Sequence, residues 1–302
     1  MLDLISVGTI SMDLSFRGKS LPLENEHFKL AIGGKYVVDE LYESVGGGGA
    51  NVALGLRQYG FEVAVLGIVG ENSFKEVILN KLHQAGVRTH LCQFHKGYLN
   101  VSSIFLTEAG ERSIVHYEPP YADLFTDLKD FDALLETRAI YLGNLPDVDI
   151  SQRTQLLTLT KHNDILTILN LGVKDVRRDQ KELEPLIAQT DILIINGHEF
   201  ADLVKKKYED LDFRSNVVAE EKILIDKTVI VTDSEKGSFG YTKGRVFHQK
   251  AVEVEKIVDT TGAGDGYTAG FITQYLRSKD IEEAMFQGAE QAAKVLAKVG
   301  AN

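Results

Sequence analysis

Short apolar runs alternate along the chain with longer amphipathic segments. Patterns typical of buried strands cover residues 2–8, 62–69, 139–142, 164–170, 191–195 and 228–232. Helical spacing of apolar residues covers 73–85, 150–162, 178–189, 197–208, 213–225, 263–278 and 280–298. Strands that alternate with helices form a mainly parallel sheet with helices on both faces. We therefore predict an α/β fold with three layers, α/β/α.

Two stretches depart from this rhythm. Residues 14–45 hold short alternating apolar runs that glycine and proline interrupt, which indicates a small β excursion from the main sheet. Residues 100–107 and 112–118 alternate on either side of the turn at 108–111, as in a β-hairpin. We expect the two stretches to pair as a separate small sheet. Arg112 lies beside the turn, and we expect it to be a solvated charge. The alternative is that it is a lid residue whose side chain reaches the site.

Length and charge narrow the classes of function. The 302 residues fit one large α/β domain or two small ones. Lys and Arg number 33 and Asp and Glu 44, so the formal net charge is −11. This balance argues against nucleic-acid binding, which usually needs a basic surface. It leaves room for a phosphate ligand, because backbone N–H groups can bind one locally.

The sequence also predicts a cytoplasmic protein without a membrane partner. No apolar run approaches the roughly 18 residues of a membrane-spanning helix, and residues 1–10 lack the layout of a signal peptide. Cys92 is the single cysteine, which excludes an intrachain disulfide and fits a reducing compartment.

The most informative stretch runs from Asp259 to Gly266, with the sequence Asp-Thr-Thr-Gly-Ala-Gly-Asp-Gly. It lies between a β-branched run and a helical pattern, so it predicts a glycine-rich turn that opens a helix. Backbone N–H groups and the helix dipole attract anions at such a start. Asp265 within it has two interpretations: a simple helix cap, or a general base that deprotonates a substrate hydroxyl beside a bound phosphate.

A second glycine-rich turn lies upstream. Gly46 to Gly49 precede Ala50 and Asn51, and a helical pattern follows directly. The glycines allow close approach of a ligand, and the Asn51 amide offers a donor and an acceptor. The simpler interpretation is a flexible turn with Asn51 as a cap. Asp13 follows the first strand, at the end where α/β sheets place ligand groups; it could equally be a turn residue.

Polar side chains also follow two later strands. Asn196 and Glu199, after the strand at 191–195, suit a water-coordinated Mg²⁺ with phosphates. Read alone, the pair fits a helix capping box better. Thr232 to Gly237, after the strand at 228–232, could contact a nucleotide or form a hydrophilic turn. The eight histidines lack metal-type spacing, and no Walker A or Rossmann fingerprint is present.

Together these features resemble the ribokinase-like (PfkB) carbohydrate kinase family. The resemblance rests on the turn from Gly46 to Asn51 and on the stretch from Asp259 to Asp265, in the expected order. It implies a ribokinase-like fold and a single kinase domain over residues 1–302. The lid would be a small β-sheet from about 14–45 and 98–118.

The resemblance also implies a role for each candidate residue. Asp265 is expected to be the catalytic base, with Gly262, Ala263 and Gly264 as the anion hole. Substrate hydroxyls would be held by Asp13, Gly47, Gly48 and Asn51. ATP and Mg²⁺ would be bound by Asn196, Glu199, Thr232, Gly237 and Gly264. Asp259 would lie near a site for a monovalent cation such as K⁺. Two residues depart from the family pattern: Gly48 replaces a common lysine, and Ala289 replaces an amide or imidazole near the adenine.

The function implied is ATP-dependent phosphorylation of a small sugar. A nucleoside kinase and a non-catalytic ligand-binding protein of the same fold are the alternatives. The retained Asp265 argues against the non-catalytic protein, which has no need of a base there. Since proteins tend to cover exposed β edges, we also expect a homodimer paired through the lid.

Overall fold

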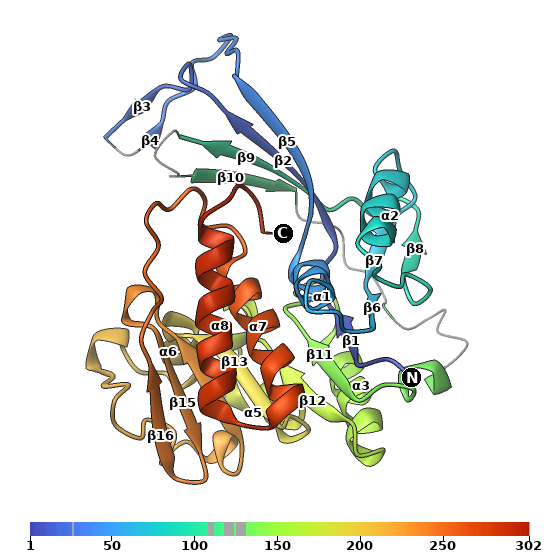
Figure 1. Ribbon diagram of the computed structural model, residues 1–302, viewed down its shortest axis with the longest axis vertical. Coiled ribbons are helices and arrows are strands. Elements are labelled where there is room, and N and C mark those ends of the chain that lie inside the picture. Colours follow the sequence, from blue (N-terminus) through green and yellow to red (C-terminus); the bar gives the residue numbers. More distant parts are fainter. Residues whose placement is uncertain (26, 108–111, 118–123, 125–130, 302) are drawn as a thin grey trace.

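The structure is a computed structural model that describes residues 1–25, 27–107, 112–117, 124 and 131–301 (Figure 1). Within these residues, a sheet of eight strands forms the centre, in the order β16-β15-β14-β13-β12-β11-β1-β6. Its strands are β1 (Leu4–Val7), β6 (Val63–Leu66), β11 (Ala139–Leu142), β12 (Leu166–Leu169), β13 (Ile192–Asn196), β14 (Thr228–Thr232), β15 (Ser238–Thr242) and β16 (Arg245–Gln249).

The strands from β6 to β14 in this order pair in parallel, and β15 and β16 add an antiparallel edge. Parallel strands are covered on both faces, which explains why β1, β6 and β11 are apolar at nearly every position. The predicted mainly parallel sheet is confirmed, and β15 and β16 form a hairpin at its edge.

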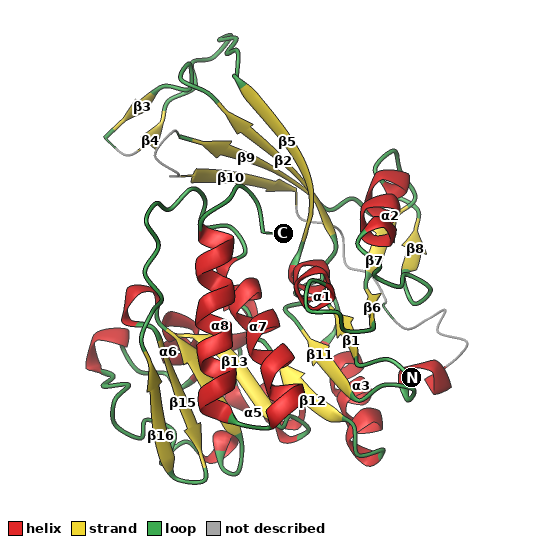
Figure 2. Ribbon diagram, in the orientation of Figure 1, coloured by secondary structure: helices red, strands yellow, loops and turns green. Residues whose placement is uncertain are grey.

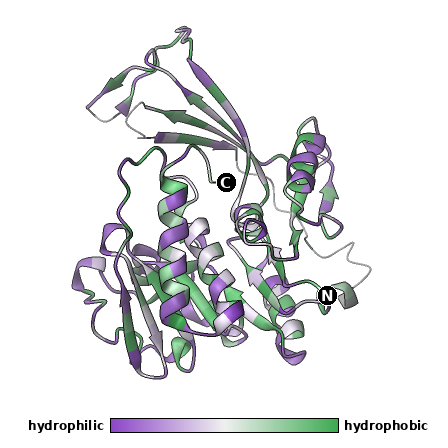
Figure 3. Ribbon diagram, in the orientation of Figure 1, coloured by the Kyte–Doolittle hydropathy of each residue, from purple (hydrophilic) through white to green (hydrophobic). Residues whose placement is uncertain are grey.

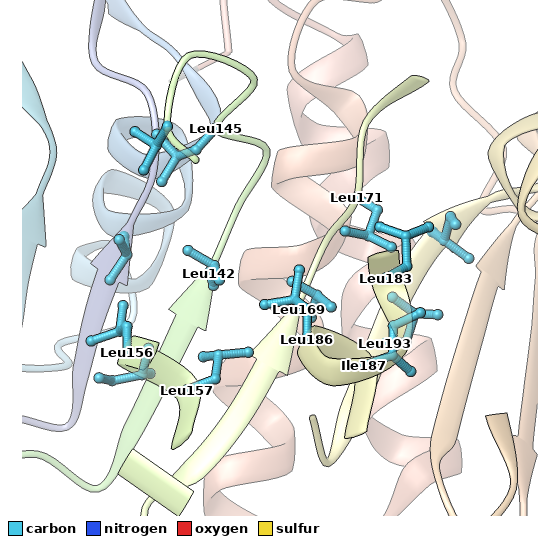
Figure 4. Packing of buried hydrophobic residues seen from close by; sticks show 14 of the residues in the cluster. Leu142, Leu145, Leu156, Leu157, Leu169, Leu171, Leu183, Leu186, Ile187 and Leu193 are labelled. Atoms are coloured by element: carbon cyan, nitrogen blue, oxygen red, sulfur yellow. The ribbon is translucent and has the colours of Figure 1, made fainter. Parts of the chain in front are cut away.

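Helices cover both faces of this sheet (Figure 2). They are α1 (Gly48–Arg57), α2 (Lys75–Gln84), α3 (Ile150–His162), α4 (Val173–Val176), α5 (Gln180–Ala188), α6 (Gly197–Leu203), α7 (Ala263–Ser278) and α8 (Ile281–Leu296). One buried cluster joins the sheet to α3, α5 and α6 (Figure 4), and a second joins it to α1, α7 and α8. Ile5 belongs to the first cluster and Leu4 to the second, because successive strand residues point to opposite faces.

A second sheet lies apart from the central one, above the C-terminal ends of its strands (Figure 1). Its order is β10-β9-β2-β5, with β2 (Ser11–Arg17), β5 (Glu40–Gly46), β9 (Val101–Leu106) and β10 (Arg112–Tyr117). We call it the lid sheet. The strands β9 and β10 are the expected hairpin, and β9 pairs in parallel with β2, so the expected pairing of the two stretches is confirmed. The turn expected at 108–111 lies outside the described residues.

Smaller strands complete the structure, and the strand expected at 62–69 is divided between β6 and one of them, β7 (Ile68–Gly70). The pair β3 (Leu23–Glu24) and β4 (His27–Phe28) forms a hairpin at the tip of the lid, and β7 pairs with β8 (Gln93–His95). The alternating apolar residues between 30 and 38 lie outside strands. Figure 3 shows the central strands as mainly hydrophobic, whereas hydrophilic and hydrophobic residues alternate in the lid.

Two local predictions were wrong, and one of two alternative interpretations, that of Asp13 as a turn residue, is ruled out. The helix expected at 213–225 is a series of turns that ends in a short 3₁₀ helix at Lys222–Leu224. The Asp212 carboxylate and carbonyl accept from Arg214 and Ser215, and such local bonds compete with a helix. The helix expected at 197–208 ends at Leu203, and Lys205 takes a left-handed conformation. Asp13 lies within strand β2 of the lid sheet, not in a turn after β1.

None of the described helices is both long and apolar enough to cross a membrane.

Candidate functional site

Helix α7 begins with an exposed anion-attracting turn. Its N-cap is Gly262, whose left-handed φ of 73° a side chain would disfavour. Ala263 and Gly264 form the first turn, where backbone N–H groups have no acceptor within the helix. Gly264 is exposed, and an added Cβ there would meet no atom within 4 Å. An anion can therefore approach these N–H groups closely.

Asp265 lies in the same turn, and a residue from the N-terminal half of the chain holds its side chain by a hydrogen bond. Asn51 Nδ2 donates to Asp265 Oδ2 over 2.7 Å, across 214 residues of sequence. The cap of α7 is Gly262 without a side-chain bond, so the interpretation of Asp265 as a cap is wrong. Burial away from water raises the pKa of Asp265. The hydrogen bond from Asn51 lowers this pKa, and the negative charge of Asp13 raises it further. The result is a more basic carboxylate beside the anion-attracting turn.

The start of α1 has a different role from the start of α7. Thr9 accepts hydrogen bonds from the first N–H groups of α1, those of Gly48, Gly49 and Ala50. An added Cβ on Gly49 would lie only 2.6 Å from the backbone of Gly8, so this glycine allows the helix to pack against the end of β1. Asn51 is not the cap, because Gly47 takes that position. The start of α1 therefore positions Asn51 and offers little to an anion.

Asp13 approaches Asp265 from the lid sheet. It is buried, and Ser11 Oγ donates to its Oδ1 over 3.0 Å. Burial raises the pKa of Asp13, the hydrogen bonds from Ser11 and Ser102 oppose that rise, and the charge of Asp259 adds to it. Gly46 is required beside it, because an added Cβ would overlap the Asp13 carboxylate. The structure thus brings Asp13, Asn51 and Asp265 to one place between lid and body.

Gly48 borders the space beside Asp265. An added Cβ on Gly48 would lie 3.5 Å from Asp265 Oδ1, so any side chain at this position would point at the carboxylate. With glycine there, the space beside Asp265 stays open for a substrate. Gly47 adopts a φ of 88°, which favours glycine, and turns the chain into α1.

A cleft of about 1120 Å³ lies on the other side of the α7 start. It is lined by Asn196, Thr232, Gly237, Ala263 and Gly264, which the sequence assigned to the nucleotide and the anion hole. Ala289 also lines it, with apolar neighbours from α8 and from the segment before α7. Four of the predicted ATP and Mg²⁺ residues, Asn196, Thr232, Gly237 and Gly264, therefore share one cavity, which opens onto the anion-attracting turn. Glu199 is not among the residues that line it.

Basic side chains in this cleft were missed by the sequence analysis. Arg214, Lys236 and Lys250 line it, and so does Arg112 from the lid sheet. Glu235 and Glu253 also line the cleft, so four basic and two acidic side chains leave a local positive excess that suits phosphate groups. Lys236 lies within the polar segment singled out at 232–237, but nothing in the sequence placed Arg214 or Lys250 there. The expectation that Arg112 is only a solvated charge is wrong.

Asn196 and Glu199 form the capping box that the simpler interpretation predicted. Asn196 Oδ1 accepts from the Glu199 N–H over 2.8 Å, and Glu199 Oε2 accepts from the Asn196 N–H over 3.2 Å. Burial raises the pKa of Glu199 to about 7, although the bonds from Asn196 oppose that rise. Among the described residues, no cluster of three or more His, Cys, Asp or Glu could hold a metal by itself.

Asp259 is fully buried below the lid. Its Oδ1 accepts from the N–H and the hydroxyl of Thr261, at 2.8 and 2.7 Å, and its Oδ2 accepts from the Gly300 N–H over 3.0 Å. Arg112 Nη1 lies 3.8 Å from Oδ1. The lid thus contacts the stretch before α7 through an ion pair that joins Arg112 and Asp259.

Comparison with known proteins identifies the family of this chain. The family model described as pfkB family carbohydrate kinase matches residues 1–302. The chain belongs to this family. It is therefore a PfkB carbohydrate kinase, and ATP-dependent phosphorylation of a sugar is the activity of this class of enzyme.

Relatives of this PfkB kinase differ in the acceptor that their names state. A 5-dehydro-2-deoxygluconokinase of Clostridium botulinum is 24% identical over 314 residues, which cover 98% of this chain and 87% of the relative. A structure of Arabidopsis thaliana ribokinase with ribose and ATP has a TM-score of 0.80 at 23% identity and covers 99% of this chain and 94% of that one. A Methanocaldococcus jannaschii nucleoside kinase has a TM-score of 0.75 at 22% identity, with coverage of 100% and 93%. These solved structures confirm the ribokinase-like fold.

The hydrogen bond from Asn51 and the charge of Asp13 act on Asp265 in opposite directions. We expect Asn51→Leu to raise the pKa of Asp265, because the charged carboxylate loses a donor, and Asp13→Asn to lower it, because a nearby negative charge is removed. A carboxyl-carbon NMR titration of the Asp265 side chain measures both shifts. Shifts of the same sign in the two variants would contradict the assigned causes.

Proposed function

We propose that this PfkB kinase transfers the γ-phosphoryl group of ATP to a hydroxyl of a small sugar, with Asp265 as the general base. The hydrogen bond from Asn51 to Asp265, beside the open first turn of α7, is the observation that carries the proposal. This bond holds the Asp265 carboxylate, whose pKa is raised, between two regions. One is the space bordered by Asp13 and Gly48, and the other is the cleft with basic side chains. The whole chain acts as one kinase domain, with the lid in segments 14–45 and 98–118.

Each part of this arrangement has a defined task in phosphoryl transfer. Asp265 accepts the proton of the attacking hydroxyl, since a carboxylate of raised pKa is the stronger base. The N–H groups from Gly262 to Gly264 bind the oxygens on which negative charge accumulates. In the cleft, Asn196, Thr232 and Gly237 hold ATP. The lid carries Asp13 to the acceptor and excludes water, which would otherwise attack ATP.

The residues present fit a magnesium ion bound through water. Glu199 is a partly buried carboxylate, and the capping box uses only its Oε2. Its Oε1 and the Asn196 side chain would hold water molecules of the ion, as expected for a metal that keeps its waters and binds phosphates. When bound, Mg²⁺ neutralises charge on the phosphates of ATP.

An ADP-release assay with a panel of sugars and nucleosides tests the proposed function. We expect turnover with a sugar in the wild type, and a loss of at least about 100-fold in kcat for Asp265→Asn, since a general base contributes that much or more. ATP binding, measured by calorimetry, should survive this isosteric change. Undiminished turnover in the variant would refute the role of Asp265.

The same panel separates the alternatives. Higher kcat/KM for adenosine than for every sugar would favour a nucleoside kinase. Tight ligand binding without turnover would favour a non-catalytic protein.

A potassium ion on Asp259 fits less well. Three hydrogen bonds already reach the two carboxylate oxygens, and Arg112 supplies a positive charge beside them. We propose that the guanidinium of Arg112 neutralises the negative charge of Asp259, which a monovalent cation would otherwise neutralise. Turnover in KCl and in tetramethylammonium chloride of equal ionic strength should therefore agree within about twofold, less than 0.5 kcal/mol. A strong requirement for K⁺ would contradict this.

We propose, finally, that two copies pair through their lids. The outer strands of the lid sheet are β5 and β10, and both expose apolar side chains: Leu41, Tyr42, Ile114, Val115 and Tyr117. Pairing would cover these side chains and the free backbone groups of an edge strand. Sedimentation at micromolar concentration should show a dimer, and Leu41→Glu together with Val115→Glu should give monomer. A wild type that sediments as a monomer would contradict the pairing.

A further inference from the structure

Four polar residues form one row across the lid sheet. In the register of the sheet, Asp13 on β2 lies opposite Ser44 on β5 and opposite Ser102 on β9, and Ser102 lies opposite His116 on β10. Residues opposite each other on neighbouring strands point to the same face. We call Ser44, Asp13, Ser102 and His116 the polar row.

The polar row faces the site. Ser44 lies next to Gly300, because an added Cβ on that glycine would be 3.6 Å from the Ser44 hydroxyl. Asp13 faces Gly46 and acts electrostatically on Asp265. The other face of the lid sheet is mixed: Phe16 stacks on Phe105 at 5.8 Å, and Leu14 lies between Glu43 and Ser103. Polar side chains in one row on the inner face form a strip that hydroxyl groups can bind.

Hydrogen bonds connect three members of this row. Ser102 Oγ lies 3.2 Å from His116 Nδ1, and the Ser102 side chain also bonds to Asp13. Asp13 and Ser102 are buried, whereas His116 is exposed, so the row runs from the interior to the open end of the site. Since Ser102 engages Nδ1, the Nε2 atom of His116 is the one that can meet a ligand.

The spacing of the strands limits which acceptor molecules can reach both Asp13 and His116. Neighbouring strands lie about 4.8 Å apart, so the backbones of His116 and Asp13 are two spacings, about 10 Å, apart. One Ser102 side chain bridges the two side chains, so a single small molecule can contact both. A hydroxyl that reaches His116 must lie beyond those held at Asp13 and Asp265, and a hexose carries one more CH₂OH group than a pentose. The carboxylate of Asp13 disfavours a charged acid at this strip.

We propose that His116, oriented by Ser102, determines the acceptor by binding a second hydroxyl of a neutral polyol of hexose size. The inference rests on the proposed kinase function and names its substrate class. His116 is a specificity residue and not a base, because Asp265 already lies beside the phosphate turn. His116→Ala should therefore weaken acceptor binding and leave the transfer step nearly unchanged.

The test compares D-fructose, D-ribose, adenosine and D-gluconate as acceptors for the full chain. In the wild type, fructose should have the highest kcat/KM. In His116→Ala, KM for fructose should rise about tenfold, the loss of one hydrogen bond of about 1.4 kcal/mol, while kcat stays within about threefold. KM for ribose should stay within about twofold. His116→Gln should recover part of the loss, whereas Ser102→Ala should raise KM for both fructose and ribose, because Ser102 also bonds to Asp13.

A matched control is available outside the lid sheet. His27, on strand β4 of the small β3–β4 hairpin at the tip of the lid, is also exposed, and its Nδ1 bonds to the nearby carbonyl of Asn25. His27→Ala should match the wild type with every acceptor. An equal change for fructose and ribose in His116→Ala, or a fall in kcat without a change in KM, would overturn the proposal. So would the highest kcat/KM for gluconate, ribose or adenosine.

Binding measurements separate this inference from the kinase proposal. Calorimetry on the Asp265→Asn background gives the Kd of fructose without turnover, and adding His116→Ala should raise that Kd about tenfold. If the wild type binds fructose without turnover and His116→Ala weakens binding, only the kinase proposal fails. If turnover is present but His116→Ala leaves the Kd unchanged, only the role of His116 fails. A wild type that binds no sugar of the panel overturns both.

Discussion

The site depends on one hydrogen bond between two helix starts. Asn51 in the first turn of α1 donates to Asp265 in the first turn of α7, and the rest of the site is arranged around this contact. The bond stabilises a charged carboxylate where burial and the charge of Asp13 disfavour it. Without Asn51, the carboxylate would hold its proton to a higher pH and lose its direction.

Close backbone packing makes this contact possible. Gly8 and Gly49 approach so closely that a Cβ on either would clash with the backbone of the other. Thr9 then satisfies the first N–H groups of α1, so this helix start is closed. The start of α7 has no comparable partner among its described contacts. Two glycine-rich turns that look alike in the sequence thus differ in structure: the N–H groups of one are satisfied by Thr9, and those of the other stay open.

The lid contributes side chains to two neighbouring regions of the molecule. Asp13 and the polar row lie near Asp265, whereas Arg112 lines the cleft together with Asn196 and Thr232 of the central sheet. Asp13, the polar row and Arg112 all belong to one small sheet. A movement of this sheet would therefore act on both regions together, and the ion pair of Arg112 with Asp259 joins the sheet to the stretch before α7.

The sequence by itself determined the α/β rhythm, the parallel strands and the two glycine-rich helix starts, because apolar periodicity and glycine act locally. It also singled out Asp265 and the capping box of Asn196 and Glu199. The structure alone decided that Asn51 serves Asp265 and is no cap, and that Asp13 belongs to the lid. It also placed Arg112 in the cleft beside the start of α7, and it formed the polar row from four separate strands. These contacts depend on sheet register and on residues far apart in the chain, and local spacing holds no information about either.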